Sequence, residues 1–299
     1  MKRLMTPAAL LLSACVSTEA TRPQVAITVD DLPVHGEIPR GETPTSVARD
    51  VIAALKAANV DAYGFINGYW TEKDAASTEV LSLWRAAGLP LANHGWSHRH
   101  LSEMSASEFE QELVRNEPLL SGGQEDWRWF RYPFLDEGEN AEKRAAGREV
   151  LARHSYKIAA VTMDFSDWAW TAPYARCRDA GDEAALRQLE HMYMRAARDS
   201  IGYYRQLSRT AYGRDIPYVL LLHVSAFEAR MLPRLLQLYR DEGFRVVSLA
   251  EAEADPAYAD QMRPRLPAEP QGLEDKASRK SPLPQRTDYQ PILQAMCRG

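Results

Sequence analysis

Residues 24–31 of the sequence, QVAITVDD, place a short β-branched run directly before two adjacent carboxylates. Residues 25–29 have the composition of a buried strand, and Asp30 and Asp31 follow it at once. Adjacent carboxylates repel each other unless a cation or another partner neutralises one of them. We therefore predict a strand whose carboxyl end carries a metal ligand beside a general base. A turn or a helix cap is the alternative interpretation of the pair.

Strand-like apolar runs alternate with helical periodicity along the rest of the chain. The expected strands cover residues 25–29, 63–67, 89–93, 128–132, 157–163, 218–222 and 244–249. The expected helices cover residues 44–60, 72–87, 105–119, 139–154 and 229–242, the third opened by a capping box of Ser105 and Glu108. This alternation favours one parallel sheet. We predict an α/β fold, a distorted (β/α) barrel of about seven parallel strands with a helical insertion.

Composition fits a soluble globular protein. The chain has 299 residues, of which 45% are hydrophobic and 26% charged, enough for one large barrel or two modest domains. Lys and Arg number 36 against 41 Asp and Glu, a formal net charge of −5, so we predict no nucleic acid partner. Three cysteines are too few for a disulfide scaffold.

The first residues resemble a bacterial lipoprotein signal. A basic start, MKR, precedes an apolar stretch at residues 4–12 that is shorter than the roughly 20 residues needed to span a bilayer. The sequence LSAC at residues 12–15 resembles a lipobox, so we expect removal of residues 1–14 and lipidation of Cys15. The alternative is a chance cysteine behind an ordinary signal peptide.

Lipidation would place the protein in the cell envelope, held on the membrane by acyl chains and facing the periplasm. Residues 15–23 would form the tether. Val16 is not the aspartate that retains many lipoproteins at the inner membrane, which favours the outer membrane.

Beyond the tether, we expect the barrel over residues 24–255 with a helical insertion at about 171–215. Seven prolines punctuate a polar tail, residues 256–299, which we expect to lack a core of its own. Cys177 in the insertion and Cys297 in the tail could pair in an oxidising compartment, but the sequence leaves the distance between them open.

Side chains that could act as metal ligands, acids or bases follow most of the expected strands. Because the carboxyl ends of parallel barrel strands open on one face, we expect these side chains to meet. They are Asp30 and Asp31 after the first strand, His94 and His98 after the third, Arg131 at the end of the fourth, Asp164 and Asp167 after the fifth, and His223 after the sixth.

Two of these residues have the spacing of metal ligands. His94 and His98 are four residues apart, which places both imidazoles on one side of a helical turn and suits a shared divalent ion. His100 could compete as the second ligand, and a polar His-rich loop is the alternative. Two histidines and one carboxylate would leave positions for water and substrate. Histidines without a motif are interpreted as surface or helix residues: His35, His154 and His191.

In their order along the chain, five motifs resemble those of the polysaccharide deacetylase family, which includes chitin, chitooligosaccharide, xylan and peptidoglycan deacetylases. The motifs are TVDD at 28–31, HGWSH at 94–98, RYPF at 131–134, DFSDW at 164–168 and LLLH at 220–223. The resemblance covers about residues 25–249. It implies a distorted (β/α) barrel and metal-dependent removal of N- or O-acyl groups.

The resemblance also implies a role for each motif residue. Asp30 would be the general base, Arg131 would keep it ionised and oriented, and His223 would be the general acid with its pKa raised by Asp167. The metal ligands would be Asp31, His94 and His98, with zinc the default ion and cobalt or nickel as alternatives. The substrate-binding residues would be Pro133, Phe134 and Trp168. The alternatives are core packing for Trp168 and a buried structural histidine for His223.

Three positions depart from the family pattern. Leu32 stands where glycine is usual, Gly95 where serine or threonine is usual, and Phe134 where tyrosine is common. None removes a ligand, base or acid, but loop shape and pocket polarity set specificity.

From the motifs and the lipoprotein-like signal together, we predict a hydrolase of carbon–nitrogen bonds other than peptide bonds, acting on an acetylated glycan of the cell envelope. The alternatives are an amidohydrolase for a non-sugar amide and a non-catalytic glycan-binding lipoprotein.

Overall fold

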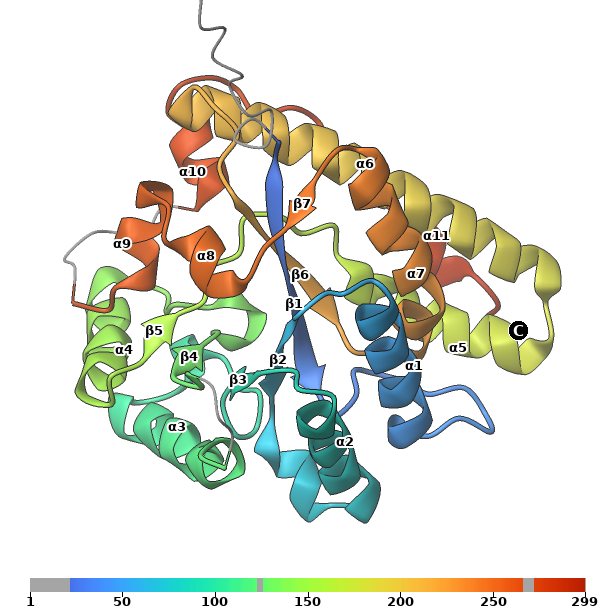
Figure 1. Cartoon of the computed structure of the whole chain (residues 1–299), viewed down its shortest axis with the longest axis horizontal. Helices are drawn as coiled ribbons and strands as arrows, with labels where there is room; N and C mark the ends of the chain where they lie inside the picture. The colour runs from blue at the N-terminus through green and yellow to red at the C-terminus, as the bar shows by residue number, and fades with distance from the viewer. Residues whose placement is uncertain (1–21, 123–125, 266–271, 299) are drawn as a thin grey trace, which may run out of the picture.

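The computed structural model describes residues 22–122, 126–265 and 272–298, so Cys15 and the predicted signal lie outside the described residues. Seven strands form one parallel sheet in the order β5-β4-β3-β2-β1-β6, with β7 also paired to β1. The strands are β1 (Gln24–Leu32), β2 (Tyr63–Ile66), β3 (Leu91–Asn93), β4 (Trp129–Phe130), β5 (Lys157–Ile158), β6 (Tyr218–His223) and β7 (Arg245–Val246). Figure 1 shows this sheet at the centre with helices around it.

The segment after β5 joins the two edges of the sheet. Met163 forms a parallel bridge with Leu220 of β6, and the Leu221 N–H donates to the Met163 carbonyl at 3.0 Å. The sheet is therefore nearly closed, which confirms the predicted distorted (β/α) barrel.

The strand expected at residues 157–163 is interrupted at this seam. Regular pairing with β4 ends at Ile158, and one further hydrogen bond joins the Ala159 N–H to the Phe130 carbonyl at 2.8 Å. Side chains bind the backbone groups that follow. The Arg131 guanidinium donates to the carbonyls of Ala159 and Ala160 at 3.3 and 3.2 Å, and Glu253 accepts from the Ala160 N–H at 2.7 Å. These partners satisfy the backbone without a regular strand.

Helices cover the outside of the barrel, and their apolar faces form its main core. The capping box of Ser105 and Glu108 is confirmed at the start of α3. The longer helices around the sheet are α1 (Pro44–Ala57), α2 (Ala75–Ala86), α3 (Ala106–Leu120), α4 (Ala141–Arg153) and α7 (Ala226–Asp241). The short ones are η2 (Gly68–Glu72), η3 (Leu101–Glu103), η4 (Pro133–Leu135), η5 (Asp167–Trp170), α8 (Leu249–Glu253) and η6 (Pro256–Tyr258).

The expected insertion consists of two helices, α5 (Thr171–Ala180) and α6 (Glu183–Tyr212). In Figure 1, α6 extends along one side of the barrel. Its apolar face is buried in the main core through Leu189, Tyr193 and Leu207. The insertion is therefore part of the packed body of the protein. Within the described residues, no helix combines the length and apolar character needed to cross a membrane.

The described part of the tail, residues 256–265 and 272–298, carries η6 and the short helices α9 (Ala259–Met262), α10 (Leu273–Ser278) and α11 (Gln290–Ala295). Leu273 of α10 and Leu293 of α11 are buried in the main core. Cys177 and Cys297 form a disulfide, with Cα atoms 5.1 Å apart, that links the tail to α5. The tail packs on the barrel and uses the barrel's core.

Asp215 holds the connection between α6 and β6, the strand that ends at His223. Its carboxylate accepts hydrogen bonds from Arg205 at 3.1 Å, Arg209 at 3.0 Å and the Tyr218 hydroxyl at 2.7 Å. Burial opposes the charged form, but these partners outweigh it and lower the pKa of Asp215 to about 2 from its ordinary value of 3.8.

We predict that Asp215→Asn lowers the free energy of unfolding at pH 7 by about 1 to 2 kcal/mol. Because the folded pKa is depressed, the carboxylate's contribution is complete above about pH 4 and is lost as the pH falls towards 2. Urea unfolding of both proteins from pH 7 to pH 2 measures this difference. Asp199→Asn, at an exposed carboxylate 3.8 Å from Arg195, is the matched control. A difference that persists unchanged at pH 2 contradicts the explanation.

Candidate active site

The predicted site residues meet at the carboxyl ends of the strands, as the parallel topology requires. They surround a cavity of about 290 Å³, which we term the central cavity. Its lining includes seven of the predicted site residues: Asp30, Asp31, His94, His98, Phe134, Trp168 and His223. Asp164 also lines it, whereas the side chains of Arg131 and Asp167 are buried behind it.

Asp31, His94 and His98 form a cluster suited to a divalent metal. One ligand atom from each lies within 4.8 Å of the others. The Asp31 Oδ1 atom is 3.4 Å from His94 Nε2 and 3.2 Å from His98 Nε2. This oxygen is buried and accepts no hydrogen bond from the described part of the chain. A buried carboxylate oxygen facing two imidazole nitrogens is the donor set of a three-ligand catalytic zinc site, so these residues fit the predicted metal.

The backbone fixes the orientation of His94. Its Nδ1 atom is 2.8 Å from the carbonyl of Arg131, which can only accept, so Nδ1 donates and Nε2 keeps its lone pair. Asn67 Nδ2 donates to the His94 carbonyl at 2.8 Å and holds the same turn from the other side. Such outer hydrogen bonds set the tautomer of a metal-binding histidine.

The structure shows that His98, and not His100, lies in the cluster with Asp31 and His94. His98 points at Asp31, and burial lowers its pKa to about 4, which keeps it neutral as a ligand must be. His100 instead lies 3.3 Å from Asp136 and stacks on the Phe134 ring, with ring centroids 3.8 Å apart. The cluster therefore contains His98.

His35 is a site residue that the sequence analysis missed, and its interpretation as a surface or helix residue is wrong. Its Nδ1 is 2.6 Å from Asp31 Oδ2, and its ring centroid is 4.9 Å from that of His223. Burial raises the pKa of Asp31, but the contacts from His35 and His94 outweigh it and hold that pKa well below its usual range. His35 thus orients Asp31 so that Oδ1 faces the cluster. The other two histidines lie away from the site: His154 caps α4 and His191 is exposed on α6.

Asp30 lies beside the cluster with its two oxygens in different environments. Oδ1 accepts from the fully buried Arg131 guanidinium at 3.0 Å. Oδ2 is 3.6 Å from His94 Nε2. The same Arg131 nitrogen donates to the Thr28 hydroxyl at 2.7 Å, which fixes the geometry of the pair. One oxygen is therefore held in place, and the other is free to accept a proton.

His223 lies at the end of β6 and is paired with Asp167. The Asp167 carboxylate binds His223 Nδ1 at 2.9 Å and the His223 N–H at 2.7 Å. Burial disfavours the imidazolium, but the charge and hydrogen bond of Asp167 outweigh it and raise the pKa of His223 to about 10. Glu228, which the sequence analysis did not single out, is buried near this pair and accepts a hydrogen bond from the Tyr193 hydroxyl. Burial and the nearby Asp167 charge raise its pKa well above the usual range.

Aromatic side chains form the rim of the site. Phe134 is 56% exposed and Trp168 is 41% exposed, so both offer apolar surface to a ligand. Phe134 has a φ of 58°, a left-handed conformation that costs a non-glycine residue energy and that turns the chain at this rim. Pro133 is buried and does not line the cavity, which corrects its prediction as a substrate-binding residue; its neighbours Tyr132 and Leu135 do line it.

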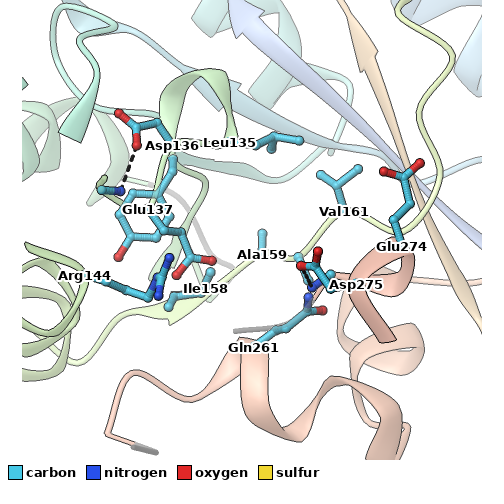
Figure 2. Close-up of a pocket in the computed structure, with 14 residues that line it drawn as sticks. Leu135, Asp136, Glu137, Arg144, Ile158, Ala159, Val161, Gln261, Glu274 and Asp275 are labelled. Carbon is cyan, nitrogen blue, oxygen red and sulfur yellow. Dashed lines mark hydrogen bonds between the residues drawn. The ribbon is translucent and has the colours of Figure 1, made fainter. Parts of the chain in front are cut away.

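Two further cavities share residues with the central cavity. One, of about 520 Å³, shares Tyr132 and Leu135. Figure 2 shows its acidic walls, which include Asp136 and Glu137 on one side and Glu274 and Asp275 on the other. The second, of about 310 Å³, shares His35 and Trp168. The central cavity therefore lies between two other depressions in the surface.

Comparison with known proteins agrees with this fold. The family model described as polysaccharide deacetylase matches residues 17–152. The fold resembles BA3943, a CE4 family pseudoenzyme from Bacillus anthracis, with 16% identity over 77% of this chain and 65% of that one and a TM-score of 0.53. It also resembles a BA3943 mutant with restored enzymatic activity, with 17% identity, coverage of 77% and 67%, and a TM-score of 0.53. This chain thus spans about two thirds of the pseudoenzyme's length.

A third similar structure is the Bc1960 peptidoglycan N-acetylglucosamine deacetylase, with 18% identity over 77% of this chain and 87% of that one and a TM-score of 0.50. No curated protein sequence matches this chain. Residues 17–152 carry the polysaccharide deacetylase domain that the family model describes.

We predict that His98→Ala abolishes stoichiometric binding of zinc, whereas His100→Ala retains it. His98 faces Asp31, and His100 is occupied by Asp136 and Phe134. Metal analysis after removal with a chelator and reloading measures this difference. Retention of zinc by His98→Ala together with its loss from His100→Ala would place the ligand at residue 100.

Proposed function

We propose that this protein is a metal-dependent deacetylase of an acetylated glycan in the cell envelope. One observation carries the proposal: a cluster suited to a metal lies between a carboxylate, Asp30, and a histidine, His223, that is charged at neutral pH. This is the arrangement that acyl hydrolysis needs, because water must lose a proton and the leaving amine must gain one.

The predicted ligands Asp31, His94 and His98 would hold the metal, which would supply Lewis acidity towards the acyl oxygen and make water more acidic. Asp30 Oδ2 accepts the proton as water attacks the acyl carbon. Arg131 keeps Oδ1 hydrogen-bonded, so the base needs no reorientation during the step. Zinc is the ion we propose first, with cobalt or nickel as alternatives.

His223 acts as the general acid in this proposal. Its Nδ1 is engaged by Asp167, so Nε2 carries the proton that the departing amine takes. The Asp167 pair keeps the imidazolium populated at neutral pH, before the collapse of the tetrahedral intermediate. Trp168 and Phe134 would contact the acyl group and the sugar at the rim.

The complete set of predicted ligands, base and acid favours turnover over a binding role. The pseudoenzymes among the similar structures make this an experimental question, because the fold also occurs without activity. The substrates we propose are N-acetylated or O-acetylated oligosaccharides and polysaccharides, the class named by the family model.

We predict metal-dependent acetate release from acetylated oligosaccharides. Asp30→Asn and His223→Ala should each lower kcat/KM by about 10²- to 10⁴-fold, the usual contribution of general acid–base catalysis. Asp61→Asn and His191→Ala, at exposed positions away from the site, are the matched controls. Zinc content and thermal unfolding of each variant show whether the site and the fold are retained.

The panel contains N-acetylated chitin and peptidoglycan fragments and O-acetylated xylan fragments, each tested with and without zinc. Metal-dependent release that neither Asp30→Asn nor His223→Ala affects contradicts the assigned roles. Zinc-loaded, folded protein that releases acetate from none of these substrates favours a glycan-binding protein.

We also propose that Cys15 carries a lipid that anchors the protein in the envelope facing the periplasm, with the outer membrane favoured. The support is the LSAC sequence at residues 12–15 behind a short apolar segment. Cys15→Ser should prevent incorporation of labelled palmitate and move the protein out of the membrane fraction. Equal labelling of wild type and Cys15→Ser rules out this attachment site.

A further inference from the structure

The cavity of about 310 Å³ beside the central cavity has walls from three distant parts of the chain. We term it the flank cavity. Its walls are the loop at residues 35–37 after β1, the segment at residues 168–176 through η5 and α5, and the tail helix α11 with Arg298. His35 and Trp168 line both cavities, so the flank cavity opens directly beside the cluster of Asp31, His94 and His98.

The tail helix is a fixed wall. Arg176 of α5 donates to the carbonyls of Leu293 and Met296 at distances of 3.1 to 3.2 Å. The next residue, Cys177, is joined by its disulfide to Cys297. Leu293 is 1% exposed and belongs to the main core. These contacts hold α11 in one position against α5, as a binding wall requires.

The opposite wall is equally close-packed. A Cβ atom at Gly36 would lie 2.9 Å from Thr171 Cγ2, and Gly36 has a φ of +68°, so the loop that carries His35 can approach α5 only with glycine there. Thr171 lines the cavity and is buried, yet its hydroxyl has no hydrogen-bond partner among residues 22–122, 126–265 and 272–298. Such a hydroxyl is available to a ligand.

The chemistry of these walls suits a sugar ring. The indole of Trp168 presents an exposed apolar face, against which the C–H face of a pyranose can pack. Gln290, Gln294 and Arg298 are exposed at the other wall and offer amide and guanidinium groups to hydroxyls. An apolar platform with a few polar groups around it is the usual character of a ligand pocket.

We propose that the flank cavity binds the saccharide residue linked to the acetylated one, so that the substrate is at least a disaccharide. This proposal rests on the proposed function, because the acetylated residue occupies the central cavity. In this proposal the tail helix α11 contacts the substrate, and the disulfide between Cys177 and Cys297 holds that helix in place. Binding energy from this second residue, which does not react, can be used to orient the reacting acetyl group.

The experiment compares zinc-loaded wild type with Gln294→Trp on an N-acetylated disaccharide and on the corresponding monosaccharide. In the wild type, kcat/KM should be at least about tenfold higher for the disaccharide. Gln294→Trp fills the cavity from an exposed position, so it should lower kcat/KM for the disaccharide and remove this preference. Gln237→Trp, on the exposed face of α7, is the matched control. Cys297→Ser releases the wall by a second route and should reduce the same preference.

The outcomes separate this inference from the proposed function. Acetate release with equal kcat/KM for both substrates, or a length preference unchanged in Gln294→Trp, overturns the flank cavity as a subsite and leaves the deacetylase standing. If the wild type releases no acetate from either sugar, the proposed function fails, and calorimetry with the disaccharide decides on the cavity. Disaccharide binding that Gln294→Trp abolishes supports a saccharide site, and absence of binding to the wild type overturns it.

Discussion

The buried guanidinium of Arg131 is the interaction on which both the barrel and the site depend. It donates to Asp30 and Thr28 on β1 and to the two carbonyls that bridge the seam after β5. Its own carbonyl accepts from His94 Nδ1. One residue therefore orients the predicted base, fixes a predicted ligand and satisfies the backbone where the sheet lacks a regular strand.

A fully buried cation is tolerated only where its surroundings compensate it, and breaking such a pair typically costs about 3 to 5 kcal/mol. Asp30 provides the opposite charge at 3.0 Å. The Phe65 ring, with its centroid 4.5 Å from the guanidinium carbon, and three further oxygen acceptors provide the rest. Glu253 contributes little negative charge near Arg131, because burial raises its pKa to about 8 and leaves it largely protonated at neutral pH. Asp30 is therefore the acidic group that contacts the guanidinium directly.

The sequence allowed prediction of what depends on local pattern and chain order. Residues 25–29 have strand composition, and Asp30 and Asp31 had to lie at the carboxyl end of that strand. The spacing of His94 and His98 likewise indicated a shared ion, and both lie in the cluster with Asp31. Other features depend on contacts between distant segments. The seam at Met163 exists because side chains replace strand partners, and no periodicity encodes that.

His35 and the tail illustrate the same limit. His35 lies in a loop with no motif, and only the turn after β1 brings it to Asp31. The tail is polar and rich in proline, which hides the few apolar residues, such as Leu293, that join it to the core. The disulfide between Cys177 and Cys297 spans 120 residues, a separation from which the sequence could not establish proximity.

Two histidines that line the central cavity, His98 and His223, have pKa values shifted in opposite directions. Burial acts against the charged form of both. For His98 it prevails over the attraction of Asp31, and the pKa falls to about 4. For His223 the hydrogen-bonded Asp167 reverses it, and the pKa rises to about 10. Asp167 is the main cause of the difference, with Asp30 and Asp31 also raising the pKa of His223 and the neighbouring histidines lowering that of His98. In the proposed mechanism one ring is a neutral ligand and the other a charged proton donor. The strand order places both rings at the central cavity, and the charged groups near each ring determine whether it is neutral or charged.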